Sequence, residues 1–316
     1  MGSESRNRYL LKNTLIFTLG NIGSRMISFF LIPLYTNVLT TSQYGTVDLI
    51  TTISTVAGPM LTLNIAESVM RFGLDKDADK EKNTQCGSIV LLIAMIIGLV
   101  LIPICRCITE VSDYAMYVYF YVISLSASQL FLCDLRGKEL LLKYSLGNIL
   151  QTLMIAILNI TFLLVFKMET GGYLLAYIIA NFIVAIYAII AGKGYKAFSF
   201  HNIDRCKLKE MIRYSIVLIP NTFMWWIMNS SDRVMVTYMI GAAANGIYAV
   251  SYKLPTLVST LTGIFNQAWS YSAIREEGTS DETEYNNKMF KTLSAIAFMM
   301  GIGLLLLTKP FLGVYV

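Results

Sequence analysis

Five charged residues lie within long apolar stretches of the sequence, where a charge needs either a partner or water. Arg25 stands about 15 residues into the first stretch and Lys253 about nine residues into a later one, so both fall well inside helices long enough to cross a bilayer. Asp48 and the neighbours Asp232 and Arg233 fall closer to one end of such stretches. Because a charge near the bilayer centre costs about 2.5–3.5 kcal/mol on insertion scales, it usually faces a cavity or an opposite charge. These five residues are therefore the first candidates for a substrate-binding site.

The chemistry of these candidates favours an anionic cargo. Three of them, Arg25, Arg233 and Lys253, are basic, and a guanidinium group offers phosphate a bidentate fork of hydrogen bonds. Asp48 and Asp232 are equally well explained as members of structural ion pairs. We therefore expect a cavity that binds an anion, especially a phosphate.

Polar side chains recur around these charges at spacings of three and four, which places them on one face of a helix. Four such stripes predict four helices around a central wet cavity, with Asn21, Trp225 and Asn229 as further binding candidates. Interhelical hydrogen bonding by Ser and Thr would explain any one stripe taken alone. The stripes consist of Thr14, Thr18, Asn21, Arg25 and Ser28; Asp48, Thr52, Thr55, Pro59 and Thr62; Thr222, Trp225, Asn229 and Asp232; and Tyr248, Tyr252, Pro255, Ser259, Thr262 and Asn266.

The elements that carry these residues are those of an all-α polytopic membrane protein. Hydrophobic residues make up 55% of the chain and charged residues only 14%, with a mean hydropathy of +0.60, whereas a soluble domain has about 25% charged residues. The first apolar stretch has no cleavage site and is expected to be a retained helix. The single histidine, His201, argues against an ordinary metal site, and no cofactor is expected. The apolar runs predict about nine membrane-spanning helices, at about 10–38, 44–69, 86–108, 114–133, 145–166, 171–192, 211–239, 244–271 and 289–308.

The loops between these helices alternate in basic content. The loops that would face outward if the N-terminus is cytoplasmic hold only Arg106, Lys167 and Lys309. The positive-inside rule therefore predicts a cytoplasmic N-terminus and odd-numbered helices that run outward. Most of the Lys and Arg lie in the opposite set of segments: Arg6, Arg8, Lys12; Arg71, Lys76, Lys80, Lys82; Arg136, Lys138, Lys143; Lys193, Lys196, Arg205, Lys207, Lys209, Arg213; and Arg275, Lys288, Lys291.

A weak internal repeat relates two helix pairs. The stretches 37–45 and 238–246 align so that Gly45 corresponds to Gly246, and each follows a long outward helix. We expect these glycines to supply the backbone freedom of a tight turn. The offset is six helices, so the repeats would be parallel, with the first and second helices corresponding to the seventh and eighth.

The helix pattern predicts two bundles. Residues 1–210 form a first six-helix bundle with a cytoplasmic linker, and residues 211–316 begin a second bundle. Because nine is an odd number of spans and earlier helices look paired, we expect the chain to be a C-terminally incomplete transporter. Each helix of the proposed cavity contains one proline, which predicts a kink where bundles must bend: Pro33, Pro59, Pro220 and Pro255.

Short motifs in both repeats resemble one transporter family. They are Leu31-Ile-Pro-Leu-Tyr35 and Tyr44-Gly45 in the first repeat, and Ser231-Asp232-Arg233, Asn245-Gly246-Ile-Tyr248 and Ser251-Tyr252-Lys253 in the second. With these motifs the chain resembles the polysaccharide-export branch of the multidrug/oligosaccharidyl-lipid/polysaccharide exporter superfamily. More narrowly, it is similar to bacterial O-antigen-type flippases, which move undecaprenyl-diphosphate-linked sugar repeat units.

The resemblance implies a two-bundle transporter of 12 to 14 helices in the bacterial cytoplasmic (inner) membrane, working by alternating access. It implies that Arg25, Arg233 and Lys253 meet the diphosphate and that Trp225 or Trp226 stacks on sugars. It further implies a role in lipopolysaccharide, O-antigen or capsule export. The partners would be lipid-linked oligosaccharide, membrane lipids, and a glycan polymerase or other export-pathway proteins, with no nucleic acid.

Two alternatives stay open. A cation-coupled multidrug exporter of the same superfamily would need cavity carboxylates, for which Asp48 and Asp232 are candidates, although basic residues outnumber them. A membrane glycan polymerase or glycosyltransferase would need a sizeable loop with catalytic residues. The predicted outer loops are short and hold at most Glu110, Asp113 and Glu169, so we expect no enzymatic activity.

Overall fold

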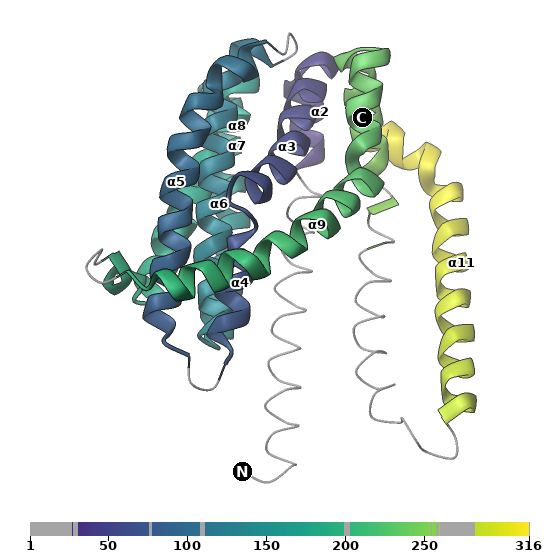
Figure 1. The fold of residues 1–316 in the computed structure, drawn as a ribbon. Coiled ribbons are helices and arrows are strands. Elements are labelled where there is room, and N and C mark those ends of the chain that lie inside the picture. Colours follow the sequence, from purple (N-terminus) through teal and green to yellow (C-terminus); the bar gives the residue numbers. More distant parts are fainter. Residues whose placement is uncertain are drawn as a thin grey trace. The chain divides into compact units, whose positions relative to one another are not determined.

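The protein is helical wherever its structure is described. The computed structural model describes residues 27, 31–75, 78–107, 111–198, 203–253, 255–256, 259 and 282–315, and no strand occurs in these ranges (Figure 1). The chain divides into two compact units, Met1–Gly246 and Ile247–Val316. Each unit is considered by itself.

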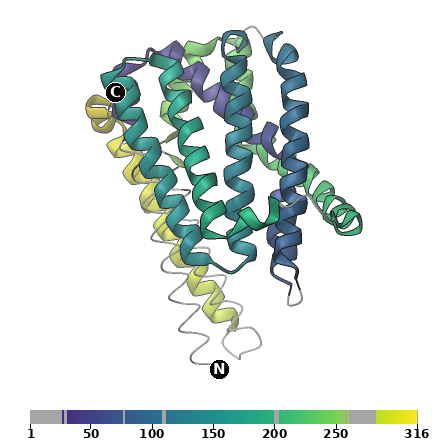
Figure 2. The same ribbon diagram turned by 90° about the vertical axis from the view of Figure 1, so that its left-hand side faces the viewer.

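Four long helices form the centre of the first unit. They pack side by side as α5 (Lys80–Arg106), α6 (Ala115–Gly137), α7 (Leu141–Ile160) and α8 (Glu169–Ala191) (Figure 2). Each is long and apolar enough to cross a bilayer, α6 together with the 3₁₀ turn η1 (Ser112–Tyr114) and α7 together with the π turn η2 (Thr161–Val165). A 3₁₀ turn, η3 (Gly194–Phe198), follows α8.

The predicted span at 44–69 is a broken helix. After the short helix α2 (Ile32–Val38), Thr40 and Gln43 form a capping box that starts α3 (Thr41–Leu61). Helix α3 ends before a bend of 60°, beyond which α4 (Ile65–Gly73) continues the chain. Counted as one span, this pair is the fifth segment able to cross a membrane.

The predicted count of about nine spans is not confirmed. Among the described residues, four helices have the length and apolar character of a span, or five with the bent pair. Helix α9 (Arg205–Met239) covers the predicted span 211–239, but its mean hydropathy is too low for this count. Most of the predicted spans at 10–38 and 244–271 lie outside the described residues.

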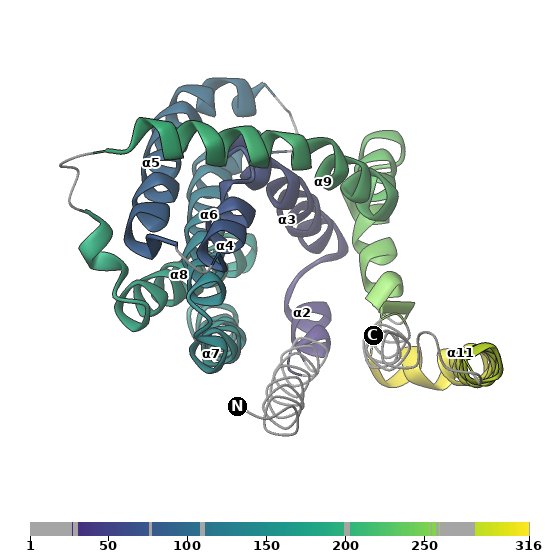
Figure 3. The same cartoon turned by 60° about the horizontal axis from the view of Figure 1, so that its bottom comes forward.

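Helix α9 is the longest of the helices whose bounds lie in the described residues. Its 35 residues give it a length of about 52 Å, more than the roughly 30 Å of a hydrocarbon core. Asp204 caps its start by accepting a hydrogen bond from the backbone N–H of Lys207 at 3.0 Å. The helix extends across α3, α4 and α5 on one side of the unit (Figure 3).

A buried apolar core joins these helices. Val69 of α4, Leu130 and Leu135 of α6, Val184 of α8 and Met211 of α9 are all at most 2% exposed and belong to one cluster. Helices α4 and α6 approach closely where their glycines Gly73 and Gly137 face each other, because a Cβ on either would crowd the opposing backbone.

The outward faces of the same helices are apolar as well. Ile96 and Val100 of α5 are 66% and 71% exposed, and Ile190 of α8 is 64% exposed. Leu142 and Leu146 present a similar face on α7. Large apolar side chains in continuous exposed rows fit acyl chains rather than water, so these helices are those of a membrane protein.

The second unit is described in two pieces. Its first residues continue a helix that begins at residue 242 and is described as far as residue 253. The other piece is α11 (Glu282–Tyr315), which contains the apolar stretch Phe290–Leu306.

Candidate functional site

A polar cluster joins three helices of the first unit. Asp48 of α3 is 5% exposed, and its carboxylate accepts a hydrogen bond from Arg233 Nη1 of α9 at 2.9 Å. Asn245, in the helix that begins at residue 242, donates from Nδ2 to the other carboxylate oxygen at 3.4 Å. The same amide nitrogen donates to the Gly45 carbonyl at 3.0 Å. We call Asp48, Arg233 and Asn245 the Asp48 cluster.

Two glycines let the helices of this cluster meet. A Cβ on Gly45 would overlap the backbone carbonyl oxygen of Ala242, and a Cβ on Gly246 would overlap that of Thr41. The contacts are reciprocal, because Thr41 and Ala242 occupy equivalent positions of the sequence repeat, as Gly45 and Gly246 do. The repeat therefore places its two copies against each other at a pair of helix N-termini.

The expected reason for these glycines was wrong. Gly45 lies inside α3 and Gly246 inside the helix over 242–253, rather than in turns. Of the glycines in the described ranges, only Gly241 has a left-handed φ, of 121°. Glycine is needed at 45 and 246 because backbone approaches backbone, a common device where membrane helices cross.

The structure brings together two of the sequence-predicted site residues. Asp48 and Arg233, both proposed from their charges, form an ion pair whose side chains are 6% and 16% exposed. Asp232 Oδ1 accepts a hydrogen bond from the Arg233 backbone N–H at 2.9 Å.

Two further candidates on α9 form other contacts. Trp225 is 60% exposed on α9, and Asn229 donates to the Trp225 carbonyl at 2.7 Å. Its neighbour Trp226 is the tryptophan that packs inward, because its Nε1 donates to the Thr52 carbonyl at 2.9 Å. Lys253 belongs to the second unit, and Asn21 and Arg25 lie outside the described residues.

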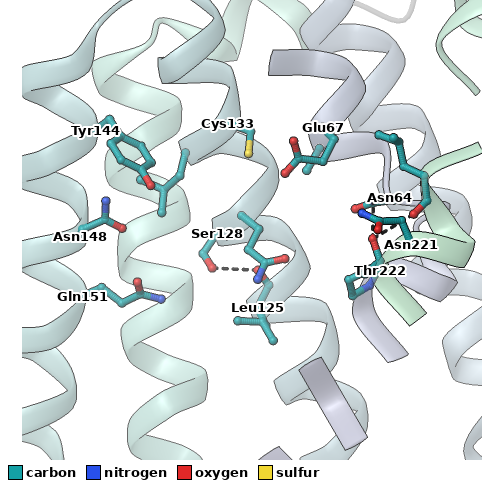
Figure 4. A pocket seen from close by; sticks show the side chains of 15 residues that line it. Asn64, Glu67, Leu125, Ser128, Cys133, Tyr144, Asn148, Gln151, Asn221 and Thr222 are labelled. Atoms are coloured by element: carbon teal, nitrogen blue, oxygen red, sulfur yellow. Dashed lines mark hydrogen bonds between the residues drawn. The ribbon is translucent and has the colours of Figure 1, made fainter. Parts of the chain in front are cut away.

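A cavity of about 670 Å³ opens where α3 breaks, and we call it the break cavity. Its walls come from the α3–α4 break and from α6, α7 and α9 (Figure 4). Polar side chains project into it from every wall: Asn64, Glu67, Ser128, Gln129, Tyr144, Asn148, Gln151, Asn221 and Thr222.

The break that forms this cavity has a local cause. Pro59 has no backbone N–H, so the last turn of α3 lacks one hydrogen bond. Leu63 and Asn64 then adopt left-handed conformations, with φ of 52° and 55°, which turn the chain into α4. Asn64 Nδ2 donates to Thr222 Oγ1 at 3.2 Å and so joins the break to α9.

Sequence reasoning missed most of this cavity. Glu67 falls near the end of the predicted span 44–69, and the bend turns it into the cavity beside Cys133 (Figure 4). Asn148 falls within the predicted span 145–166 and lines the same cavity. The available signal was Pro59, because a proline inside a span predicts a kink that exposes polar groups.

The comparisons with known proteins give one match. The model of one protein family, described as "Polysaccharide biosynthesis protein", matches residues 10–274. Neither the curated proteins nor the solved structures contain a match to this chain. The matched segment includes the Asp48 cluster and every residue that lines the break cavity.

Proposed function

Because this chain belongs to the polysaccharide biosynthesis protein family, whose members generally act as flippases or exporters, we propose that it moves a lipid-linked saccharide across a bacterial cytoplasmic membrane. The cargo would be an oligosaccharide repeat unit carried on undecaprenyl diphosphate. The sugar and diphosphate pass through a polar cavity while the lipid tail stays in the bilayer. Transport proceeds by alternating access, with no covalent step.

The Asp48 cluster is the observation that supports alternating access. It joins α3, α9 and the helix over 242–253 at one end through polar contacts. An ion pair and two amide hydrogen bonds can be exchanged for water when the helices separate, whereas an apolar seam would expose its surface. This end of the molecule can therefore close and open, as one gate of an alternating-access cycle must.

Arg233 is also proposed to bind the diphosphate of the cargo. In the closed arrangement its charge is balanced by Asp48 at 2.9 Å. A diphosphate offers the same guanidinium group a stronger, bidentate partner. We propose that the cargo displaces Asp48 from Arg233, so that binding of the anion and opening of the gate are one event. Arg25 and Lys253 complete the proposed diphosphate site.

The proposed topology follows the distribution of basic residues. The N-terminus is cytoplasmic, about nine helices cross the membrane, and residues 1–210 and 211–316 belong to two bundles that move against each other. The closable end formed by the Asp48 cluster then faces outward, since α3 follows an outward-running first helix.

Cells that lack the protein test this function. We expect lipid-linked repeat units to accumulate on the cytoplasmic face and to be cleared by the parent protein. Arg25→Ala, Arg233→Ala and Lys253→Ala should fail to clear them when compared at equal amounts of membrane protein, while Lys209→Ala, which removes an exposed lysine on α9, should succeed. Normal clearance by all three variants of the basic residues would contradict the proposed diphosphate site.

One observation favours a second candidate, a cation-coupled multidrug exporter. Glu67 is a carboxylate inside a cavity large enough for a drug-sized molecule. If cells without the protein accumulate no saccharide intermediate but retain cationic dyes, and Glu67→Gln fails to restore dye efflux, this second function replaces the first.

A further inference from the structure

We propose that the break cavity is the saccharide-binding part of the transport site and that Glu67 makes it select neutral over acidic sugars. This inference rests on the proposed function, because it divides the cargo into a glycan held here and a diphosphate held elsewhere. The observation that supports it is the set of polar side chains that meet at the break in α3.

The volume of the cavity fits a glycan rather than an ion. At about 670 Å³ it lies within the roughly 300–1,000 Å³ of ordinary ligand pockets. A single water molecule takes up only about 30 Å³ of liquid volume, so an ion with its water shell would fill a small part of this space. A segment of one or two sugar rings is of the right order of size.

The polar groups of the cavity are available to a ligand. Within the described ranges, the side chains of Gln129, Asn148 and Asn221 form no hydrogen bond to protein, and the carboxylate of Glu67 forms neither a hydrogen bond nor an ion pair. A carboxamide both donates and accepts, and a carboxylate accepts at two oxygens. Sugar hydroxyl groups, which also donate and accept, match this set.

The cavity also contains apolar surface between its polar groups. Leu125, Leu132 and Pro59 line it beside Tyr144, whose ring lies 5.4 Å from the guanidinium carbon of Arg136. The C–H edges of a sugar ring can pack on such surface while its hydroxyl groups reach the amides. A drug-sized hydrophobic cation would leave most of these amides without partners, at a cost in binding.

The charge of the cavity excludes the diphosphate. Among the described residues that line it, Glu67 is the one charged side chain, and it is negative. A diphosphate, or a uronic acid at the same place, would be repelled by this like charge. The site should therefore accept neutral or N-acetylated sugars, and removing the charge of Glu67 should admit acidic ones.

Binding of two defined disaccharides to the purified protein tests this inference. Saturation-transfer NMR in detergent should detect binding of N,N′-diacetylchitobiose to the parent protein, but no binding of digalacturonic acid. Asn148→Ala should weaken binding of the neutral disaccharide by about fivefold, which is the effect of losing one hydrogen bond. Asn37→Ala, which removes an exposed amide on α2 outside the cavity, should change nothing. Glu67→Gln should bind both probes.

A second readout does not depend on how well the variants fold. Cys133 lines the cavity, whereas Cys206 is exposed on α9. In the parent protein, the neutral disaccharide should slow alkylation of Cys133 relative to Cys206. Equal protection of both thiols, or binding that is unchanged in Asn148→Ala and Glu67→Gln, would overturn the inference.

The two proposals can fail separately. If cells show saccharide transport that needs Arg233 while the disaccharide results above are negative, the cavity assignment is wrong and the flippase function stands. If the disaccharides bind as expected but no lipid-linked intermediate accumulates in cells, the protein binds sugars without the proposed transport.

Discussion

Two buried charges, Asp48 and Arg233, are central to the proposed function. Asp48 and Arg233 are separated by 185 positions, yet they form an ion pair that is almost closed to solvent. Such a pair contributes little net stability, but loss of one member leaves the other charge buried and uncompensated. The pair therefore holds the closed arrangement firmly and can still be exchanged for another anion.

Asp48→Asn should lower stability through this effect. It leaves the Arg233 charge without its carboxylate, at a cost of about 3–5 kcal/mol for a buried pair. Thermal unfolding in detergent should show a clear fall in midpoint. Asp75→Asn, which breaks the exposed pair between Asp75 and Arg71, is the matched control and should leave the midpoint unchanged. Equal midpoints for both variants would show that the Asp48 pair is not buried as described.

Exchanging the two charges distinguishes the ion pair of Arg233 with Asp48 from its proposed binding of the diphosphate. The double variant Asp48→Arg/Arg233→Asp keeps an ion pair between α3 and α9, so its unfolding midpoint should recover toward that of the parent. Clearance of lipid-linked saccharide in cells should stay absent, because the diphosphate would meet an aspartate at position 233. Full recovery of clearance would mean that Arg233 serves only the ion pair.

Two features of the helices position the break cavity and the Asp48 cluster. One is the break in α3, and the other is the close contact of helices at Gly45 and Gly246. Pro59 and the left-handed Leu63 and Asn64 open the break cavity, and Gly45 and Gly246 bring the repeats together. Both features depend on the backbone, since they set where helices end and how closely they approach. Side chains of the Asp48 cluster and of the break cavity then take their places from these elements.

Adding a methyl group at the crossing should separate these helices. Gly45→Ala and Gly246→Ala each place a Cβ on a backbone carbonyl oxygen of the opposing helix, so both should lower the unfolding midpoint and impair clearance. Because the two contacts are halves of one crossing, the double variant should lose less than the sum of the single losses. Gly301→Ala, in open space on α11, should be neutral or stabilising by about 1 kcal/mol. Strictly additive losses would show that the two contacts are independent.

The sequence predicts helices better than it predicts what they enclose. Apolar runs locate α5 to α8 to within a few residues, because length and hydropathy decide a membrane span. Asp48 and Arg233 could be selected singly as costly charges. Their pairing could not be predicted, because it depends on contacts between distant segments. The position of Glu67 in the break cavity could not be predicted for a related reason, since counting along a straight helix cannot include a bend of 60°.

The proposed function requires that the whole protein has one fixed orientation in the membrane. The positive-inside rule places the chain after α5 outside and the start of α9 inside. Cys107 lies just after α5 and Cys206 near the start of α9, and both are exposed and free. These two natural thiols report on opposite faces of the proposed topology.

Labelling of intact cells with a membrane-impermeant maleimide tests this orientation. Cys107 should react before permeabilisation and Cys206 only after it. Cys107→Ser and Cys206→Ser variants identify the labelled residue in each case. Reaction of Cys206 in sealed cells, with Cys107 protected, would invert the topology and place the Asp48 cluster at the cytoplasmic end.

The flippase function is tested most directly by measuring transport of a lipid-linked saccharide by the purified protein. Proteoliposomes would carry undecaprenyl-diphosphate-linked oligosaccharide in both leaflets, and a membrane-impermeant glycosidase would be added outside. We expect the inner-leaflet fraction to become digestible over time with the parent protein and to stay protected with Arg233→Ala. If the inner fraction stays protected with the parent protein while the same vesicles transport a cationic dye, the protein is a drug exporter and the flippase account is wrong.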